Sequence, residues 1–105
     1  MPLLNIDMNK KNTLFLESLF QSCKQLGLVE TQYDFSKLCG RNTTWFSASK
    51  CRNLPISSHA AITLSVRLKR YADEQAPRSH KLTIRKLSET LARYVEARAL
   101  MGEEA

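Results

Sequence analysis

The sequence has few of the residues that break regular structure. Its 105 residues include three glycines and three prolines, too few for the many tight turns of an all-β fold. Hydrophobic residues make up 43% of the chain, which suffices for a globular core and exceeds what a disordered chain contains. The length allows one domain with one additional element. The composition therefore favours a helical domain.

Long apolar runs and paired cysteines are also missing. No apolar run approaches the roughly 20 residues that span a bilayer, and the N-terminus lacks the charged-then-apolar pattern of a signal peptide. Cys23, Cys39 and Cys51 form no Cys-x-x-Cys pair, so we expect neither a disulfide framework nor a metal site. Reduced cysteines packed in a core are the simpler interpretation. The sequence thus predicts a cytoplasmic protein with no membrane partner.

No combination of residues indicates catalysis. His59 and His80 are far apart in sequence and have no acid at a useful spacing. There is no Ser/His/Asp arrangement, no phosphate-binding glycine loop and no pair of carboxylates in an apolar setting. We therefore expect no enzyme, no catalytic residues and no cofactor.

Acidic residues are absent from the middle third of the chain. No acid lies between Asp34 and Asp73, whereas residues 1–34 have a net charge of −1 and residues 73–105 a net charge of zero. The formal charge of +6 thus comes from seven cations: Lys37, Arg41, Lys50, Arg52, Arg67, Lys69 and Arg70. Such asymmetry favours a polyanionic partner, usually nucleic acid. The alternative is a basic surface that only keeps the protein soluble.

Apolar residues at three- and four-residue steps predict a series of helices. Four are expected within a domain over residues 12–72, at 12–26, 32–39, 43–52 and 57–72. Each starts at a residue that can cap it: Asn12, Thr31, Asn42, and Ser57 or Ser58. Gly27 and Gly40 end the first two, because glycine enters the left-handed conformation without a Cβ clash.

The two ends of the chain are expected to be simpler. Residues 1–11 should be a flexible N-terminus, 73–81 a polar linker, 82–101 a C-terminal helix and 102–105 a tail. The last helix has a narrow apolar stripe, as in a seam between two helices. We predict a dimer interface there, formed by Leu87, Leu91, Tyr94 and Val95. The same stripe could instead fold back onto its own core.

The second and third predicted helices have the spacing of a helix-turn-helix. Counted from Gln32, Ser36 is fifth, where a small side chain lets two helices cross closely, and Gly40 is ninth, in the turn. Phe46 is fifteenth and would seat the second helix on the core. The fourth and eighth positions are apolar, as required: Phe35 and Cys39. The predicted fold is all-α, a four-helix helix-turn-helix core plus a C-terminal helix.

The stretch "FSKLCGRNTTWFS" resembles the lambda-repressor-like, Cro/C1-type helix-turn-helix family, especially its variant Leu-Gly-Arg-Ser-x-x-Tyr-Leu-Ser. It is also similar to small regulators of alphaproteobacterial mobile elements and prophages, in which "GLV…YDFS…GR" follows the first helix. The resemblance covers about Leu14 to Ala72. It departs from the family at Arg41 and Ser49, where apolar residues are common.

The resemblance implies a site on the third helix. In that family this helix lies in the major groove; here the residues toward the bases would be Thr43, Thr44, Ser47 and Ala48, with Cys51 at the far end. Hydroxyl side chains read several bases. Phosphates would be contacted by Gln32, which also steadies Thr43, and by Arg41, Asn42, Lys50 and Arg52.

These features predict a sequence-specific DNA-binding transcriptional regulator, a repressor of a mobile element or prophage, that binds double-stranded DNA as a homodimer. A different class stays open. An antiactivator would use the same scaffold to bind and block a transcription-activator protein. DNA binding needs the cationic face of residues 43–52, whereas antiactivation would use apolar residues of the first, fourth or last helix.

Overall fold

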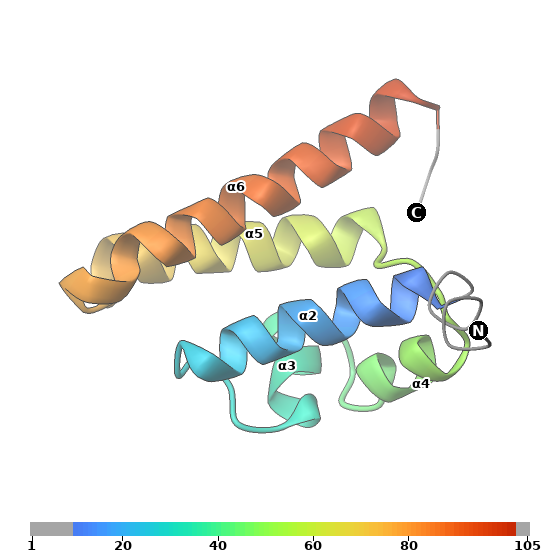
Figure 1. Cartoon of the computed structure of the whole chain (residues 1–105), viewed down its shortest axis with the longest axis horizontal. Coiled ribbons are helices and arrows are strands. Elements are labelled where there is room, and N and C mark those ends of the chain that lie inside the picture. Colours follow the sequence, from blue (N-terminus) through green and yellow to red (C-terminus); the bar gives the residue numbers. More distant parts are fainter. Residues whose placement is uncertain (1–9, 103–105) are drawn as a thin grey trace, which may run out of the picture. The chain divides into compact units, whose positions relative to one another are not determined.

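The computed structural model describes residues 10–102, and in this part of the chain it contains five α-helices and no strand (Figure 1). The helices are α2 (Lys11–Gln25), α3 (Gln32–Leu38), α4 (Trp45–Cys51), α5 (Ser58–Glu74) and α6 (Arg78–Leu100). The predicted all-α class, with four helices before a C-terminal helix, is confirmed. Most of the predicted flexible N-terminus and of the tail lies outside the described residues.

The chain divides into two compact units. The N-terminal unit comprises residues 10–37 and 41–56, with α2, α4 and all but the last residue of α3. The C-terminal unit comprises residues 38–40 and 57–102, with α5 and α6. None of the described helices is long and apolar enough to cross a membrane.

Three phenylalanines form the centre of the N-terminal unit. Phe20 of α2, Phe35 of α3 and Phe46 of α4 are all buried, and their ring centroids are 5.1 to 5.8 Å apart. Rings at such separations and tilts attract one another beyond the burial of their area. Each helix contributes one ring, so the cluster fixes all three helices. The predicted apolar stripe of α2 is buried with it: Leu16, Leu19 and Cys23.

The beginning of α2 differs from the prediction. Asn12 does not cap the helix, which starts one residue earlier at Lys11. The side-chain amide of Asn12 instead donates to the carbonyl of Asn53, 3.1 Å away. The predicted stop at Gly27 is confirmed, because this residue has φ +79° and Leu28 N–H returns to the carbonyl of Cys23 at 2.9 Å.

Local signals set both ends of α3 as predicted. Thr31 Oγ1 accepts from the backbone N–H of Asp34 at 3.2 Å, and the Asp34 carboxylate accepts from the N–H groups of Glu30 and Thr31. These backbone donors hold the pKa of Asp34 below its usual value. At the other end Gly40 has φ +75°. A Cβ there would lie 3.1 Å from Thr63 Cγ2, so the turn requires glycine for space as well as conformation.

The C-terminal unit is a pair of helices joined by three residues. Ser57 caps α5 as predicted, its hydroxyl accepting from Ala60 N–H at 3.1 Å. The predicted linker over 73–81 is shorter in the structure, because residues 73–74 continue α5 and residues 78–81 form the first turn of α6. Pro77 is the N-cap of α6, a position where its missing N–H costs nothing.

Two serines lie where α5 and α6 pack together. Ser65 Oγ is 2.8 Å from the carbonyl of Ser88, and Ser88 Oγ is 2.7 Å from the carbonyl of Ser65. Both serines are buried, so these reciprocal hydrogen bonds satisfy polar groups that have little contact with water. The larger apolar side chains buried in the same unit are Leu64, Leu68, Ile84 and Leu91.

The residues predicted for a dimer interface have unequal exposure. Leu91 is fully buried, whereas Leu87, Tyr94 and Val95 are half-buried. The Arg98 guanidinium lies over the Tyr94 ring, 5.3 Å from its centroid. Leu91 therefore belongs to the packing of α6 in this chain, and the other three predicted residues keep part of their surface exposed.

Two of the three cysteines are core residues, as predicted. Cys23 and Cys39 are buried and Cys51 is exposed, and none is in a disulfide. Burial raises the pKa of the Cys23 thiol to about 12, so this thiol is neutral and unreactive at ordinary pH. Within residues 10–102 no group of three His, Cys, Asp or Glu side chains is placed to hold a metal ion.

Candidate nucleic-acid interface

A buried hydroxyl connects α3 to the start of α4. Ser36 is fully buried, and its Oγ accepts a hydrogen bond from the backbone N–H of Phe46 at 3.0 Å. This N–H lies in the first turn of α4, where backbone donors have no partner within the helix. The small side chain at the fifth motif position thus provides both close approach and a cap for the next helix.

Helix α4 starts two residues later than predicted. Thr43 and Thr44 form a turn rather than the first residues of the helix. The cause is Asn42, whose side-chain oxygen accepts from Thr44 N–H at 3.2 Å and from the Thr44 hydroxyl at 3.0 Å. Such short-range bonds from asparagine favour turns over helix. Asn42 therefore shapes the entry to α4, with its side chain turned to Thr44.

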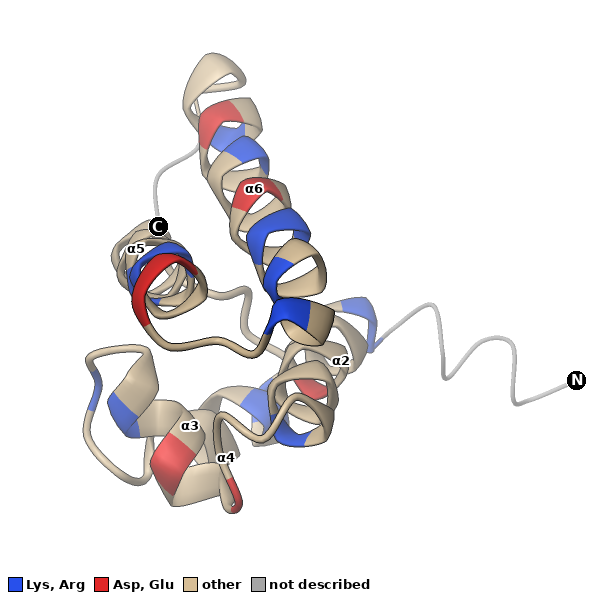
Figure 2. Cartoon of the chain, turned by 90° about the vertical axis from the view of Figure 1, so that its left-hand side faces the viewer, with Lys and Arg blue, Asp and Glu red and all other residues tan. Residues whose placement is uncertain are grey.

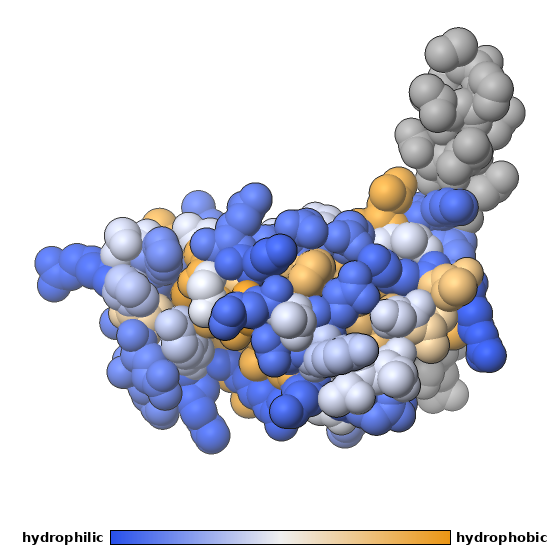
Figure 3. Space-filling view, turned by 90° about the horizontal axis from the view of Figure 1, so that it is seen from below, coloured by the Kyte–Doolittle hydropathy of each residue, from blue (hydrophilic) through white to orange (hydrophobic). Residues whose placement is uncertain are grey.

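The residues predicted to face bases are exposed together. Thr43 lies in the turn, and Thr44, Ser47, Ala48 and Cys51 follow at steps of three and four residues, which places them on one side of α4. The opposite side carries the buried Phe46 and Ser49. Figure 3 views the chain from the side on which α3 and α4 lie beneath α2, and hydrophilic residues dominate this surface.

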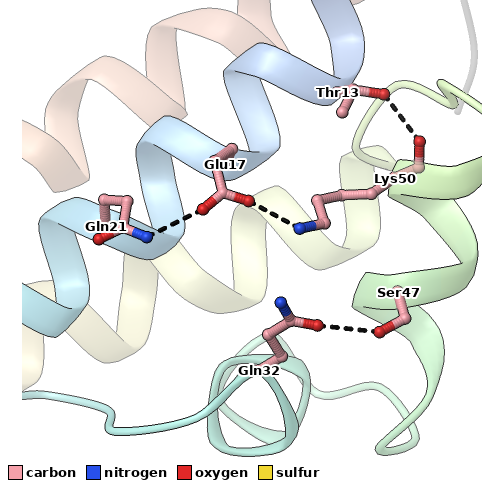
Figure 4. A network of polar contacts seen from close by, with 6 residues as sticks. All are labelled: Thr13, Glu17, Gln21, Gln32, Ser47 and Lys50. Atoms are coloured by element: carbon pink, nitrogen blue, oxygen red, sulfur yellow. Dashed lines mark hydrogen bonds and ion pairs between the residues drawn. The ribbon is translucent and has the colours of Figure 1, made fainter.

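Gln32 reaches α4 at a different residue from the one predicted. Its side-chain oxygen accepts from the hydroxyl of Ser47 at 2.9 Å, not from Thr43 (Figure 4). The two side chains line a shallow pocket of about 270 Å³ together with Thr31 and Tyr33. Gln32 therefore orients the hydroxyl of Ser47, which lies on the exposed side of α4.

The predicted phosphate-binding cations differ in availability. Arg41 and Arg52 are exposed; Arg41 precedes α4 in the chain and Arg52 directly follows it. Lys50 is half-buried: its Nζ lies 2.7 Å from Glu17 Oε1 and 4.9 Å from the centroid of the Phe46 ring. Lys50 is thus engaged within the N-terminal unit, unlike the two arginines.

Glu17 and Gln21 belong to this site and were not among the predicted residues. Gln21 Nε2 donates to Glu17 Oε2 at 2.9 Å while Lys50 contacts the other oxygen (Figure 4). Hydrogen bonds from Gln21 and then Lys50 lower the pKa of Glu17, so its carboxylate stays charged near neutral pH. The i, i+4 spacing of the α2 pair is visible in the sequence, but Lys50 is 33 residues away.

The end of α4 is fastened to the start of α2. Thr13 Oγ1 donates to the Lys50 carbonyl at 2.8 Å, and Thr13 N–H donates to Asn53 Oδ1 at 2.9 Å. Asn53 has φ +52°, a left-handed conformation that asparagine tolerates better than most residues. These bonds give partners to the Lys50 carbonyl in the last turn of α4 and to the Thr13 N–H in the first turn of α2. Asn53 therefore joins the end of α4 to α2.

Cations outnumber acids in the described part of the N-terminal unit. The acids are Glu17, Glu30 and Asp34; the cations are Lys10, Lys11, Lys24, Lys37, Arg41, Lys50 and Arg52. Along α6 lysines and arginines also outnumber the acids, which are Glu89 and Glu96 (Figure 2). Both the N-terminal unit, which contains α4, and α6 therefore carry an excess of cations.

The model of one family of unknown function, DUF6626, matches residues 16–103. The chain belongs to this family. No curated protein and no solved structure matches the chain.

The match to DUF6626 includes most of the side chains that build this interface. Glu17, Gln21, Gln32 and the whole of α4 lie within the matched residues, whereas Thr13 precedes them. The description of DUF6626 assigns no activity, so a function for this member has to come from the geometry of the site.

Proposed function

We propose that this DUF6626 chain is a sequence-specific DNA-binding transcriptional regulator, a repressor of a mobile element or prophage. The observation that carries the proposal is the exposed side of α4, on which Thr44, Ser47 and Ala48 lie together. Small hydroxyl and methyl groups on a helix fit the major groove and contact base edges there. The resemblance of the α3–α4 segment to the Cro/C1-type family supports the same orientation.

The contacts that anchor α4 also support this proposal. Base reading needs side chains held in position by packing and by hydrogen bonds behind them. The Phe46 ring and the Ser36 hydroxyl hold the start of α4, and Thr13 holds its end. The exposed Arg41 and Arg52 would pair with phosphates on either side of the helix.

The proposal includes a cytoplasmic homodimer. A single short helix makes few base contacts, and non-specific sites compete across a genome. Two copies of α4 would double the contacts and require a two-fold symmetric DNA site. We place the dimer interface on the half-buried part of the α6 stripe, Leu87, Tyr94 and Val95.

The decisive experiment selects preferred sequences from a random duplex library with purified protein. We expect an enriched, two-fold symmetric site. Thr44→Ala should relax preference at one base pair of each half-site, at a cost on the order of 1–3 kcal/mol there.

The double variant Arg41→Ala/Arg52→Ala should weaken binding to all duplexes and flatten the salt dependence by roughly one unit of slope per arginine. The matched control is Lys86→Ala/Arg93→Ala, which removes the same charge from exposed positions of α6. Equal losses in the two double variants, or the same enriched site for wild type and Thr44→Ala, would contradict the proposal.

An antiactivator is the second candidate, and an exposed apolar pair on α5 favours it. Ile62 and Val66 are one turn apart and expose 44% and 55% of their surface. Val66 also lines a groove of about 280 Å³ between α5 and α6, with Ala92 opposite. If the protein blocks an activator through this face, Ile62→Glu/Val66→Glu abolishes repression of an activator-dependent reporter and Arg41→Ala/Arg52→Ala does not.

A further inference from the structure

The sole lysine or arginine within α4 is held by an acid of α2. Lys50 Nζ lies 2.7 Å from Glu17 Oε1, and Gln21 fixes the other carboxylate oxygen at 2.9 Å. The Phe46 ring lies 4.9 Å from the lysine nitrogen on another side. Lys50 therefore has a carboxylate partner before any ligand is bound.

This ion pair can open. The side chains of Lys50 and Glu17 are 24% and 35% exposed, so water screens their attraction. A DNA phosphate offers the lysine a second anion, and every lysine that transfers to a phosphate releases counterions from the DNA. Glu17 and a phosphate would then compete for the same ammonium group.

We propose that Glu17 is an intramolecular competitor of DNA phosphate for Lys50, and that it thereby lowers the sequence-independent affinity of α4 for the DNA backbone. The inference rests on the proposed function and deepens it. Glu17 lies on α2, outside the residues that would touch DNA. It would nevertheless determine whether Lys50 is available to bind a phosphate. With Lys50 restrained, Arg41 and Arg52 are the phosphate-binding cations of the resting protein.

The anchoring of α4 does not depend on the Glu17 charge. Thr13 binds the Lys50 carbonyl, Ser36 binds Phe46 N–H, and three phenylalanine rings pack together. None of these contacts uses the Glu17 carboxylate, so we expect all of them to persist in Glu17→Gln. Glutamine has nearly the same shape as glutamate and can still pair with Gln21. Glu17→Gln therefore removes the charged partner of Lys50, and a neutral amide competes far less with a phosphate, while the helix stays seated.

The experiment measures binding to a duplex of scrambled sequence over a salt series, for wild type, Glu17→Gln, Lys50→Gln and the double variant. Glu17→Gln should bind about two- to fivefold more tightly at moderate salt, the range expected for removing an ion pair that water partly screens. The plot of log affinity against log salt should steepen by about one unit, because one more phosphate is neutralised. The double variant should keep the wild-type slope.

The control is Glu96→Gln, which removes the same charge from an exposed position on α6 and should leave the slope unchanged. An unchanged slope in Glu17→Gln, with or without a lower melting temperature, overturns the inference by making Glu17 a structural residue. The same steepening in the double variant also overturns it, since the effect would not pass through Lys50. If wild type binds duplex through Arg41 and Arg52 while Glu17→Gln changes nothing, the inference alone fails; if wild type binds no duplex, the proposed function fails with it.

Discussion

The buried hydroxyl of Ser36 offers a sharp test of how α4 is seated. Ser36→Ala removes one oxygen atom and leaves the rest of the core in place. The N–H of Phe46 loses its acceptor at 3.0 Å, in a position where the helix supplies no other. Because Ser36 is 0% exposed, water does not take the place of the hydroxyl.

The cost follows from the desolvation of that N–H. Leaving a buried donor unsatisfied destabilises a protein by about 1–3 kcal/mol, more than the net value of an ordinary hydrogen bond. For a chain of this size that corresponds to a drop in melting temperature of about 4 to 12 °C. Replacing a hydroxyl by hydrogen creates little cavity, so the hydrogen bond accounts for most of the loss.

Urea unfolding followed by tryptophan fluorescence measures this cost where it arises. The chain has one tryptophan, Trp45, and it is the first residue of α4. Ser18→Ala is the matched control, since Ser18 is an exposed residue inside α2 where alanine is the better helix former. A Ser36→Ala protein that unfolds at the same urea concentration as Ser18→Ala would show that the Ser36 hydroxyl does not hold α4.

Two further predictions concern the turn and the last helix. In thermal melts, Gly40→Ala should destabilise the protein by about 1–2 kcal/mol more than Gly27→Ala. Both glycines have positive φ, but only at Gly40 would the new Cβ press on Thr63, at 3.1 Å. Equal costs would mean that Thr63 moves aside freely. Leu87→Asp, at a half-buried position, should give a folded monomer with weakened duplex binding. Leu91→Asp should instead lower thermal stability by about 3 kcal/mol or more, because a charge enters a fully buried site. Wild-type protein that sediments as a monomer at high concentration rules out the dimer.

The sequence predicted those features that depend on neighbouring residues. Thr31 and Ser57 cap the helices that follow them, and Gly27 and Gly40 end the helices that precede them, because these signals act over three or four residues. The buried stripe of α2 and the Phe35–Phe46 anchors follow from periodicity and spacing in the same way.

Features that depend on distant residues were missed or misplaced. Asn12 is a good capping residue, but its side chain hydrogen-bonds to Asn53, 41 positions away, instead of to the backbone at the start of α2. The Glu17–Lys50 pair spans 33 positions and exists because α2 and α4 pack together. The linker was overestimated because polar residues such as Asp73 and Lys81 are as compatible with exposed helix as with a loop.

The reciprocal bonds of Ser65 and Ser88 determine the longitudinal register of the α5–α6 pair. Apolar side chains tolerate sliding between helices, since one leucine can replace another in the same hollow. Sliding by one helical turn, about 5.4 Å, would separate both hydroxyls from their carbonyl partners at 2.8 and 2.7 Å. Two small polar side chains thus select one alignment among several that the apolar surfaces permit. Any change that reshapes the exposed side of α6, including one that alters self-association, has to preserve that alignment or lose both bonds together.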